Sequence, residues 1–217
     1  MLNKSETEQK VAEFLLQIKA IKLQPNNPFT WASGWKSPIY CDNRITLSHP
    51  SIRTYIRQKL SDLIQDEFGS VGLVAGVATA GIPQGVLVAQ DLGLPFAYVR
   101  SKPKEHGTGS LIEGELFEGQ RVVVVEDLIS TGKSSLQAVQ ALRDAGCDVA
   151  GLVAIFSYGF DTADKNFKAA KCRFSTLSNY TALIHYASEH SFISSDEIEL
   201  LHKWRENPSE WGQEKES

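Results

Sequence analysis

The chain has 217 residues, a formal net charge of −4 and 42% hydrophobic residues, which is an ordinary globular composition. This composition excludes a disordered chain, and the acidic balance without long basic runs argues against a general nucleic-acid binder. The three cysteines are widely separated and form no C-x-x-C pair, so they predict neither a disulfide framework nor a zinc site. The polar N-terminus lacks the apolar core of a signal peptide, and no apolar stretch is long enough for a membrane helix. We therefore expect a cytoplasmic protein that binds no membrane.

The first third of the chain predicts two helices separated by an aromatic segment. A capping-box pattern, Ser5-x-x-Glu8, precedes apolar residues at helical spacing and predicts a helix over residues 5–22. Residues 25–50 combine prolines with several aromatic residues, which favours loops and short strands. A second helix is predicted from Pro50 to Gly69, because proline suits a first helical turn and glycine a helix end.

Strands and helices alternate in the rest of the chain. The predicted strands cover residues 71–77, 95–100, 121–125, 149–156 and 172–176, and the predicted helices cover 82–91, 134–146, 181–188 and 195–205. The intervening residues 101–119 hold four glycines and mixed charges, which predicts a long mobile loop. This order predicts an α/β fold with a mainly parallel central sheet flanked by helices, in which ligands bind beyond the carboxyl ends of the strands.

The strongest functional signal follows the β-branched run at residues 122–125. Two adjacent acids, Glu126 and Asp127, precede a turn rich in hydroxyl groups and glycine that leads into a helix. Backbone N–H groups at such a helix start can bind a phosphate, and Gly132 allows close approach of the backbone. Because two carboxylates would repel a bare phosphate, they must face sugar hydroxyls, a developing positive charge or a hydrated metal ion. The pattern is no P-loop, since Asp127 occupies the position of its first glycine.

The complete segment, residues 122–134, resembles the signature with which type I phosphoribosyltransferases bind 5-phosphoribosyl 1-pyrophosphate (PRPP). Taken alone, the acids also fit a solvated strand end followed by helix-capping residues. In the resembling family, the two acids lie under the ribose hydroxyls and the next loop binds the 5′-phosphate. The resemblance therefore implies that PRPP is bound by Glu126, Asp127, Leu128, Ile129, Ser130, Thr131, Gly132, Lys133 and Ser134.

A basic cluster lies between the predicted strand 95–100 and the glycine-rich stretch. Its cations are Arg100, Lys102 and Lys104, followed by His106. Such a cluster is usually a solvated surface, but at this place it also suits a lid that neutralises a leaving diphosphate. The spacing Arg-x-x-x-Lys-x-His-Gly resembles the catalytic loop of the orotate-specific members of the same family. This resemblance implies that Arg100, Lys104 and His106 contact the diphosphate of PRPP.

Two further segments carry the same resemblance. Residues 29–40 are similar to the F-T-x-x-S-G-x-x-S-P-x-Y/F element of the hood that covers the base, although an aromatic surface loop would also explain them. Residues 76–83 match the diphosphate-binding loop with its G-I-P ending, although close helix–strand packing would also explain them. The chain departs from some members by having Ala32 and Ala80 in place of lysines. Tyr158 stands near the place of an arginine that pairs with the base, which leaves open how the orotate carboxylate is held.

The resemblance implies one domain, with a hood at about residues 1–48, a core at about 49–205 and a frayed tail at 206–217. It implies a homodimer in which the mobile catalytic loop acts as a lid on the neighbouring subunit. Mg²⁺ is expected to be bound mainly through PRPP, with no protein residues assigned to a metal site. Ser130 is expected to reach the pyrimidine as well. The implied catalytic residues are Lys104, His106, Glu126 and Asp127.

The implied reaction transfers ribose 5-phosphate from PRPP to orotate and gives orotidine 5′-monophosphate and diphosphate, a step of de novo pyrimidine (UMP) biosynthesis. Two alternatives remain open at this point. A purine-type phosphoribosyltransferase would share the signature at residues 122–134 but lack the lid and hood motifs. A non-catalytic regulator that senses PRPP would usually carry a DNA-binding module and a basic face, which the negative net charge disfavours.

Overall fold

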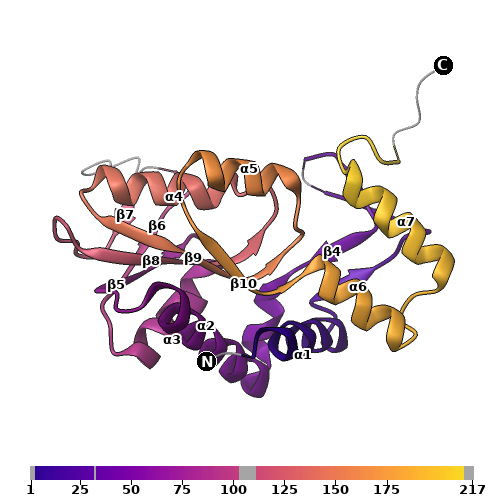
Figure 1. The fold of residues 1–217 in the computed structure, drawn as a ribbon, viewed down its shortest axis with the longest axis horizontal. Helices are drawn as coiled ribbons and strands as arrows, with labels where there is room; N and C mark the ends of the chain where they lie inside the picture. The colour runs from indigo at the N-terminus through magenta and orange to yellow at the C-terminus, as the bar shows by residue number, and fades with distance from the viewer. Residues whose placement is uncertain (1–2, 32, 103–110, 213–217) are drawn as a thin grey trace.

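The computed structural model describes residues 3–31, 33–102 and 111–212, which form a six-stranded sheet covered by helices on both faces (Figure 1). Every strand pair in this sheet is parallel except the edge pair β6–β7. The strands, in spatial order, are β10 (Phe174–Asn179), β9 (Asp148–Ser157), β8 (Arg121–Ile129), β5 (Leu73–Val77), β6 (Phe96–Val99) and β7 (Ile112–Glu113). This architecture confirms the predicted α/β class with a mainly parallel sheet.

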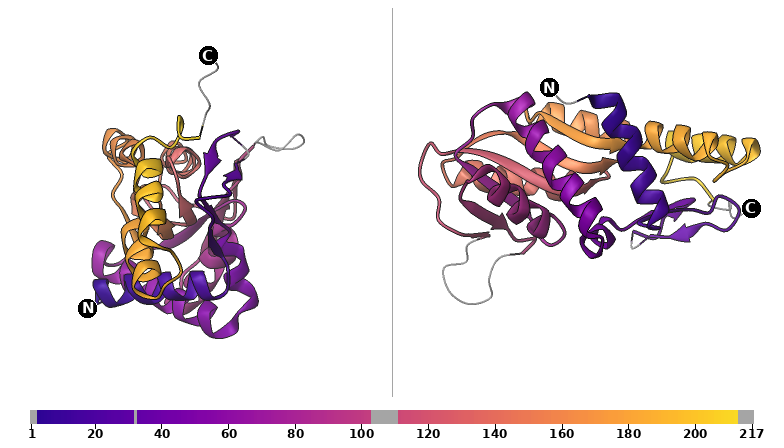
Figure 2. Two further views of the ribbon diagram at one scale, coloured as in Figure 1. Left: turned by 90° about the vertical axis from the view of Figure 1, so that its right-hand side faces the viewer. Right: turned by 90° about the horizontal axis from the view of Figure 1, so that it is seen from below.

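Two layers of helices bury the faces of the sheet. One layer contains α4 (Lys133–Asp144) and α5 (Asp161–Ala169), and the other contains α1 (Lys4–Gln17), α2 (Pro50–Phe68) and α3 (Gly81–Leu92). Alternate valines of β8 point to opposite layers, so the β-branched run is buried on both sides, as expected of a central parallel strand. Helices α6 (Tyr180–Glu189) and α7 (Ser195–Glu206) extend the molecule beyond β10 (Figure 2).

The N-terminal residues form a small antiparallel layer at the same end of the molecule as α7 (Figure 1). Strand β1 (Ile21–Leu23) pairs with β4 (Ile39–Cys41), and β2 (Phe29–Thr30) pairs with β3 (Lys36–Ser37). A 3-10 segment, η1 (Asn43–Ser48), then leads into α2. This layer is held by Trp31, whose ring lies 5.2 Å from that of Tyr158 and 5.8 Å from that of the fully buried Trp204. Aromatic packing thus fixes the N-terminal strands against the end of β9 and α7.

The first helix differs from its prediction at both ends. Its N-cap is Asn3, whose side chain accepts a hydrogen bond from the Glu6 N–H, so the predicted capping box at Ser5 is wrong. The helix ends at Gln17, and the chain reverses through Lys19, which has a φ of 56°. Lys22 therefore lies in β1 instead of the helix.

Three other local predictions also need correction. Strand β8 continues to Ile129, because its pairing with β9 persists, so the two acids lie within the strand and not after it. Helix α5 was not predicted, although Phe160, Ala163 and Phe167 have helical spacing and are buried. The short strand β7 lies within the predicted loop 101–119.

The C-terminal residues 207–212 pack back on the molecule, where Trp211 lies against the main core. Across the described part of the chain, no helix combines the length and the apolar character needed to cross a membrane.

Candidate active site

The acid pair lies where β8 leaves its neighbour β5. Glu126 is only 5% exposed, and its carboxylate accepts hydrogen bonds from Ser135 Oγ at 3.3 Å and from the Asp127 N–H at 3.0 Å. Asp127 is half-buried, so its carboxylate is the more accessible of the two. Residues 126 and 127 therefore offer one buried and one accessible carboxyl group at the carboxyl end of the central strand.

The two carboxyl groups perturb each other. Burial raises the pKa of Glu126 well above its ordinary value, and the neighbouring charge of Asp127 raises it further. Burial also raises the pKa of Asp127, against the lowering effect of its hydrogen bonds. The acid pair therefore resists carrying two negative charges, and a ligand that brings hydroxyl donors or positive charge relieves this cost.

The loop after β8 forms a cavity of about 290 Å³ at the start of α4. Its glycine, Gly132, has a φ of 76°, and a Cβ there would lie 2.6 Å from the Phe167 ring. Asn166 of α5 donates from Nδ2 to the Thr131 carbonyl at 2.9 Å, so α5 supports the loop from behind. The side chain of Ile129 is fully buried in the core and does not reach the cavity. The predicted residues that line it are Leu128, Ser130, Thr131, Gly132, Lys133 and Ser134.

The loop between β5 and α3 lies directly against this strand end. The Ala78–Thr79 peptide bond is cis, and the Ala78 N–H donates to the Val99 carbonyl at 2.8 Å. A Cβ at Gly81 would lie 2.5 Å from the Val125 carbonyl oxygen, so glycine is needed for this approach of α3 to β8. The structure thus brings the segment predicted to bind diphosphate next to the acid pair, although the two are separated by more than 40 residues in sequence.

Arg100 directly follows β6 and lines a cavity of about 330 Å³ together with Ser134 of α4. Its Nη1 lies 3.5 Å from Glu113 Oε1, so the guanidinium is partly neutralised by β7. Lys104, His106 and Ala32 lie outside the described residues.

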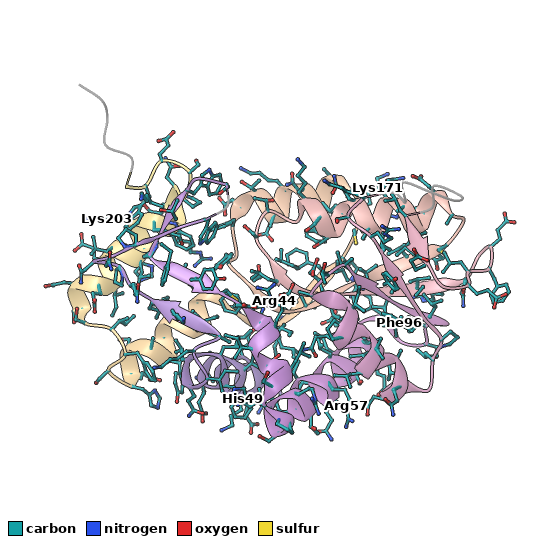
Figure 3. All side chains as sticks on the ribbon, turned by 180° about the vertical axis from the view of Figure 1, so that it is seen from behind. Arg44, His49, Arg57, Phe96, Lys171 and Lys203 are labelled. Carbon is teal, nitrogen blue, oxygen red and sulfur yellow. The ribbon has the colours of Figure 1, made fainter. Side chains whose placement is uncertain are left out.

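The 3-10 segment supplies a residue that sequence reasoning missed. The amide of Asn43 donates from Nδ2 to the Asp127 carbonyl at 2.7 Å. Its neighbour Arg44, labelled in Figure 3 between the N-terminal strands and the sheet, forms a bidentate ion pair with Asp42 at 2.6 and 2.8 Å. The hydrogen bonds from Arg44 lower the pKa of Asp42. Asn43 follows the aromatic motif by three positions, and nothing in its local sequence marks it as a partner of the acid pair.

A second residue that sequence reasoning missed is Arg205 of α7, which lies near Tyr158. Tyr158 is buried in an aromatic cluster, and burial raises the pKa of its hydroxyl, so this side chain stays neutral and offers no charge to a ligand. Arg205 approaches the adjacent backbone instead, and its Nη2 donates to the Gly159 carbonyl at 3.3 Å. Arg205 lines a cavity of about 390 Å³ together with Trp35 of the N-terminal layer and Thr131 of the loop after β8.

Comparison with known proteins gives a consistent result. The phosphoribosyl transferase domain family matches residues 45–188. The chain is 56% identical over 204 residues to the orotate phosphoribosyltransferase of Phocaeicola vulgatus, covering 94% of this chain and 96% of that protein. Among solved structures, it resembles orotate phosphoribosyltransferase from Aeropyrum pernix with a TM-score of 0.73 and 27% identity, covering 85% and 99% of the two chains. It also resembles Leishmania donovani UMP synthase with a TM-score of 0.76 and 25% identity, over 91% of this chain but only 42% of that one.

Proposed function

The chain belongs to the phosphoribosyltransferase family, and we propose that its orotate phosphoribosyltransferase activity is carried by the acid pair and the loops around it. In this reaction the bond between C1 of PRPP and diphosphate breaks with its electrons on diphosphate, orotate N1 bonds to C1, and the N1 proton is released. The purine-type and regulatory alternatives lose their support, because curated relatives that are 55–57% identical over nearly the whole chain are orotate phosphoribosyltransferases.

The observation that carries the proposal is that three segments lie together near the carboxyl end of β8: the acid pair, the loop at residues 130–134 and the loop at residues 78–81. The accessible Asp127 carboxylate orients the ribose hydroxyls and stabilises positive charge on the ring, while the N–H groups at residues 130–134 bind the 5′-phosphate. The backbone at residues 78–81 receives the diphosphate, which Arg100, Lys104 and His106 neutralise as it leaves.

A competition between bases tests this function. With orotate, adenine and hypoxanthine offered together, we expect orotidine 5′-monophosphate as the nucleotide product. A purine nucleotide would overturn the assignment.

The residues present fit a Mg²⁺ ion that is held mainly by PRPP. Asp127 offers a partly accessible carboxylate, and the described residues contain no group of three or more His, Cys, Asp or Glu side chains that could hold a metal by themselves. Mg²⁺ commonly binds through one or two carboxylates plus substrate phosphates, and it would neutralise charge on the diphosphate. The three cysteines are free, which suits work in a reducing cytoplasm.

We further propose that the enzyme is a homodimer whose loop at residues 101–110 completes the site of the neighbouring subunit. Subunit exchange between a Lys104→Ala chain and a Glu126→Gln chain tests this arrangement. If the loop acts across the dimer, equal mixing should restore about a quarter of the wild-type activity, because half of the dimers regain one intact site. If the mixture stays as inactive as its components, the loop serves its own subunit.

Arg205 is the residue that we expect to hold the orotate carboxylate. Its guanidinium is bonded to neutral acceptors, the Gly159 carbonyl and Thr181 Oγ1, and a carboxylate is a better partner for its planar donors. Arg205→Gln should raise KM for orotate about 10-fold and leave KM for PRPP nearly unchanged. Arg143→Gln is the matched control, because Arg143 also donates to backbone carbonyls, those of Ala170 and Lys171, but lies in the last turn of α4, at the opposite end of that helix from the phosphate loop. A parallel rise of both KM values with a lower Tm would show that Arg205 only supports the fold.

A further inference from the structure

Strand β8 is longer than its neighbour β5, so in the described part of the chain the last residues of β8 have no strand beside them on that edge. Pairing between β8 and β5 ends at Val125 and Gly76, whereas pairing between β8 and β9 continues to Ile129. At the other end of the pair, the Arg121 carbonyl accepts from the Gly72 N–H at 2.8 Å, so it faces β5. Because carbonyls along a strand alternate in direction, the Asp127 carbonyl faces the same edge, where β5 has already ended.

The side chain of Asn43 lies at this edge of β8 and supplies the hydrogen-bond donor that β5 does not. Its side chain is 1% exposed, and its Nδ2 donates to the Asp127 carbonyl at 2.7 Å. The thiol of Cys41 donates to Asn43 Oδ1 at 3.4 Å, which fixes the amide with its NH₂ group toward Asp127. A buried carbonyl without a donor is costly, so this hydrogen bond holds the end of β8 in its extended form.

Further hydrogen bonds connect Asn43 to α3, the helix that follows the proposed diphosphate loop. The Asn43 carbonyl accepts from Thr46 Oγ1 at 2.6 Å, and Thr46 Oγ1 accepts from Gln84 Nε2 at 3.2 Å. Asn43, Thr46 and Gln84 are all buried. These bonds tie together α3, the 3-10 segment and the end of β8, and so fix the acid pair relative to the loop at residues 78–81.

We propose that Asn43 is a positioning residue for PRPP, which acts by holding the Asp127 main chain so that its carboxylate meets the ribose hydroxyls. This inference rests on the proposed function, in which Asp127 binds the ribose. It concerns the placement of Asp127, since the amide of Asn43 itself touches the carbonyl and not the carboxylate.

A double-mutant cycle on PRPP affinity tests the proposal, with binding measured by titration calorimetry in the presence of Mg²⁺. Asn43→Ala should weaken PRPP binding about 10-fold in the wild-type background and leave KM for orotate nearly unchanged. In an Asp127→Ala background, the same change should cost less than about 2-fold, because no carboxylate remains to be positioned. An equal loss in both backgrounds would overturn the proposal and assign Asn43 a purely structural role.

Asn166→Ala is the matched control, because Asn166 also donates to a loop carbonyl but supports the phosphate loop. Its effect on PRPP affinity should persist in the Asp127→Ala background. If Asn43→Ala fails to fold, Cys41→Ala removes only the donor that orients the amide, and it should weaken PRPP binding in the same Asp127-dependent way. A wild-type protein that binds no PRPP would refute the proposed function, whereas PRPP binding with additive losses would refute this inference alone.

Discussion

Replacing Lys104 with alanine should lower kcat by about 10²–10³-fold and shift Tm by no more than about 1 °C. Negative charge accumulates on diphosphate as it leaves C1, and an ammonium group placed there stabilises the transition state more than the bound substrate. Arg100 cannot replace it fully, because Glu113 already balances part of its charge. Steady-state kinetics and thermal melting of the same preparation measure both quantities.

Lys102→Ala is the control for this experiment. It removes an exposed positive charge two residues away, outside the motif spacing, so its effect on kcat should stay below about 3-fold. Equal losses in both variants would mean that the loop acts only by its total charge. A large fall in Tm with activity retained in the Lys104 variant would contradict the catalytic assignment.

Glu126→Gln should lower kcat/KM for PRPP by about 10²-fold and at the same time raise Tm near neutral pH. The buried Glu126 has a raised pKa in the folded protein, so the folded state binds its proton more tightly than the unfolded chain does. Stability from this group is complete at low pH and is lost as the pH rises through the folded pKa. A neutral glutamine of similar shape avoids that loss, although it removes a carboxyl group of the proposed PRPP site.

Melting curves over a range of pH check the sign of this effect. The difference in Tm between variant and wild type should be smallest in acid and grow toward neutral pH. Glu115→Gln, which changes an exposed carboxylate, should show no such growth. If Glu126→Gln lowers Tm equally at all pH values, then Glu126 acts as a structural hydrogen-bond acceptor for Ser135, and ionisation of its buried carboxyl group does not lower the stability of the fold.

The regular parts of the fold could be predicted because local residue patterns encode them. The buried run at residues 122–125 and the helix from Pro50 to Gly69 have the hydrophobic period and end residues of the elements that they form. The end of the first helix could not be predicted, because the reversal occurs at Lys19, a residue type that rarely takes a positive φ. Helix α5 was missed because it is short and mostly polar, with its apolar face supplied by few residues.

The candidate site also has parts that could be predicted from the sequence and parts that could not. The acid pair and the loop after it are contiguous in sequence, so the segment at residues 122–134 could be recognised by its resemblance to a family signature. The hydrogen-bond partners of Asn43 and Arg205 are 84 and 46 residues away in sequence, respectively, so only the packed fold reveals these contacts. Arg205 in particular places its guanidinium against the Gly159 carbonyl, just after Tyr158, and so offers a candidate for the orotate contact that the sequence left open.

The most direct test of the central claim is the loss of orotate absorbance when purified protein is mixed with orotate, PRPP and Mg²⁺. We expect orotate to be consumed only when both PRPP and Mg²⁺ are present, with diphosphate released in equal amount. If PRPP binds but orotate is not consumed, the chain is a PRPP-binding protein without this activity, and the catalytic roles given to Lys104 and the acid pair are wrong.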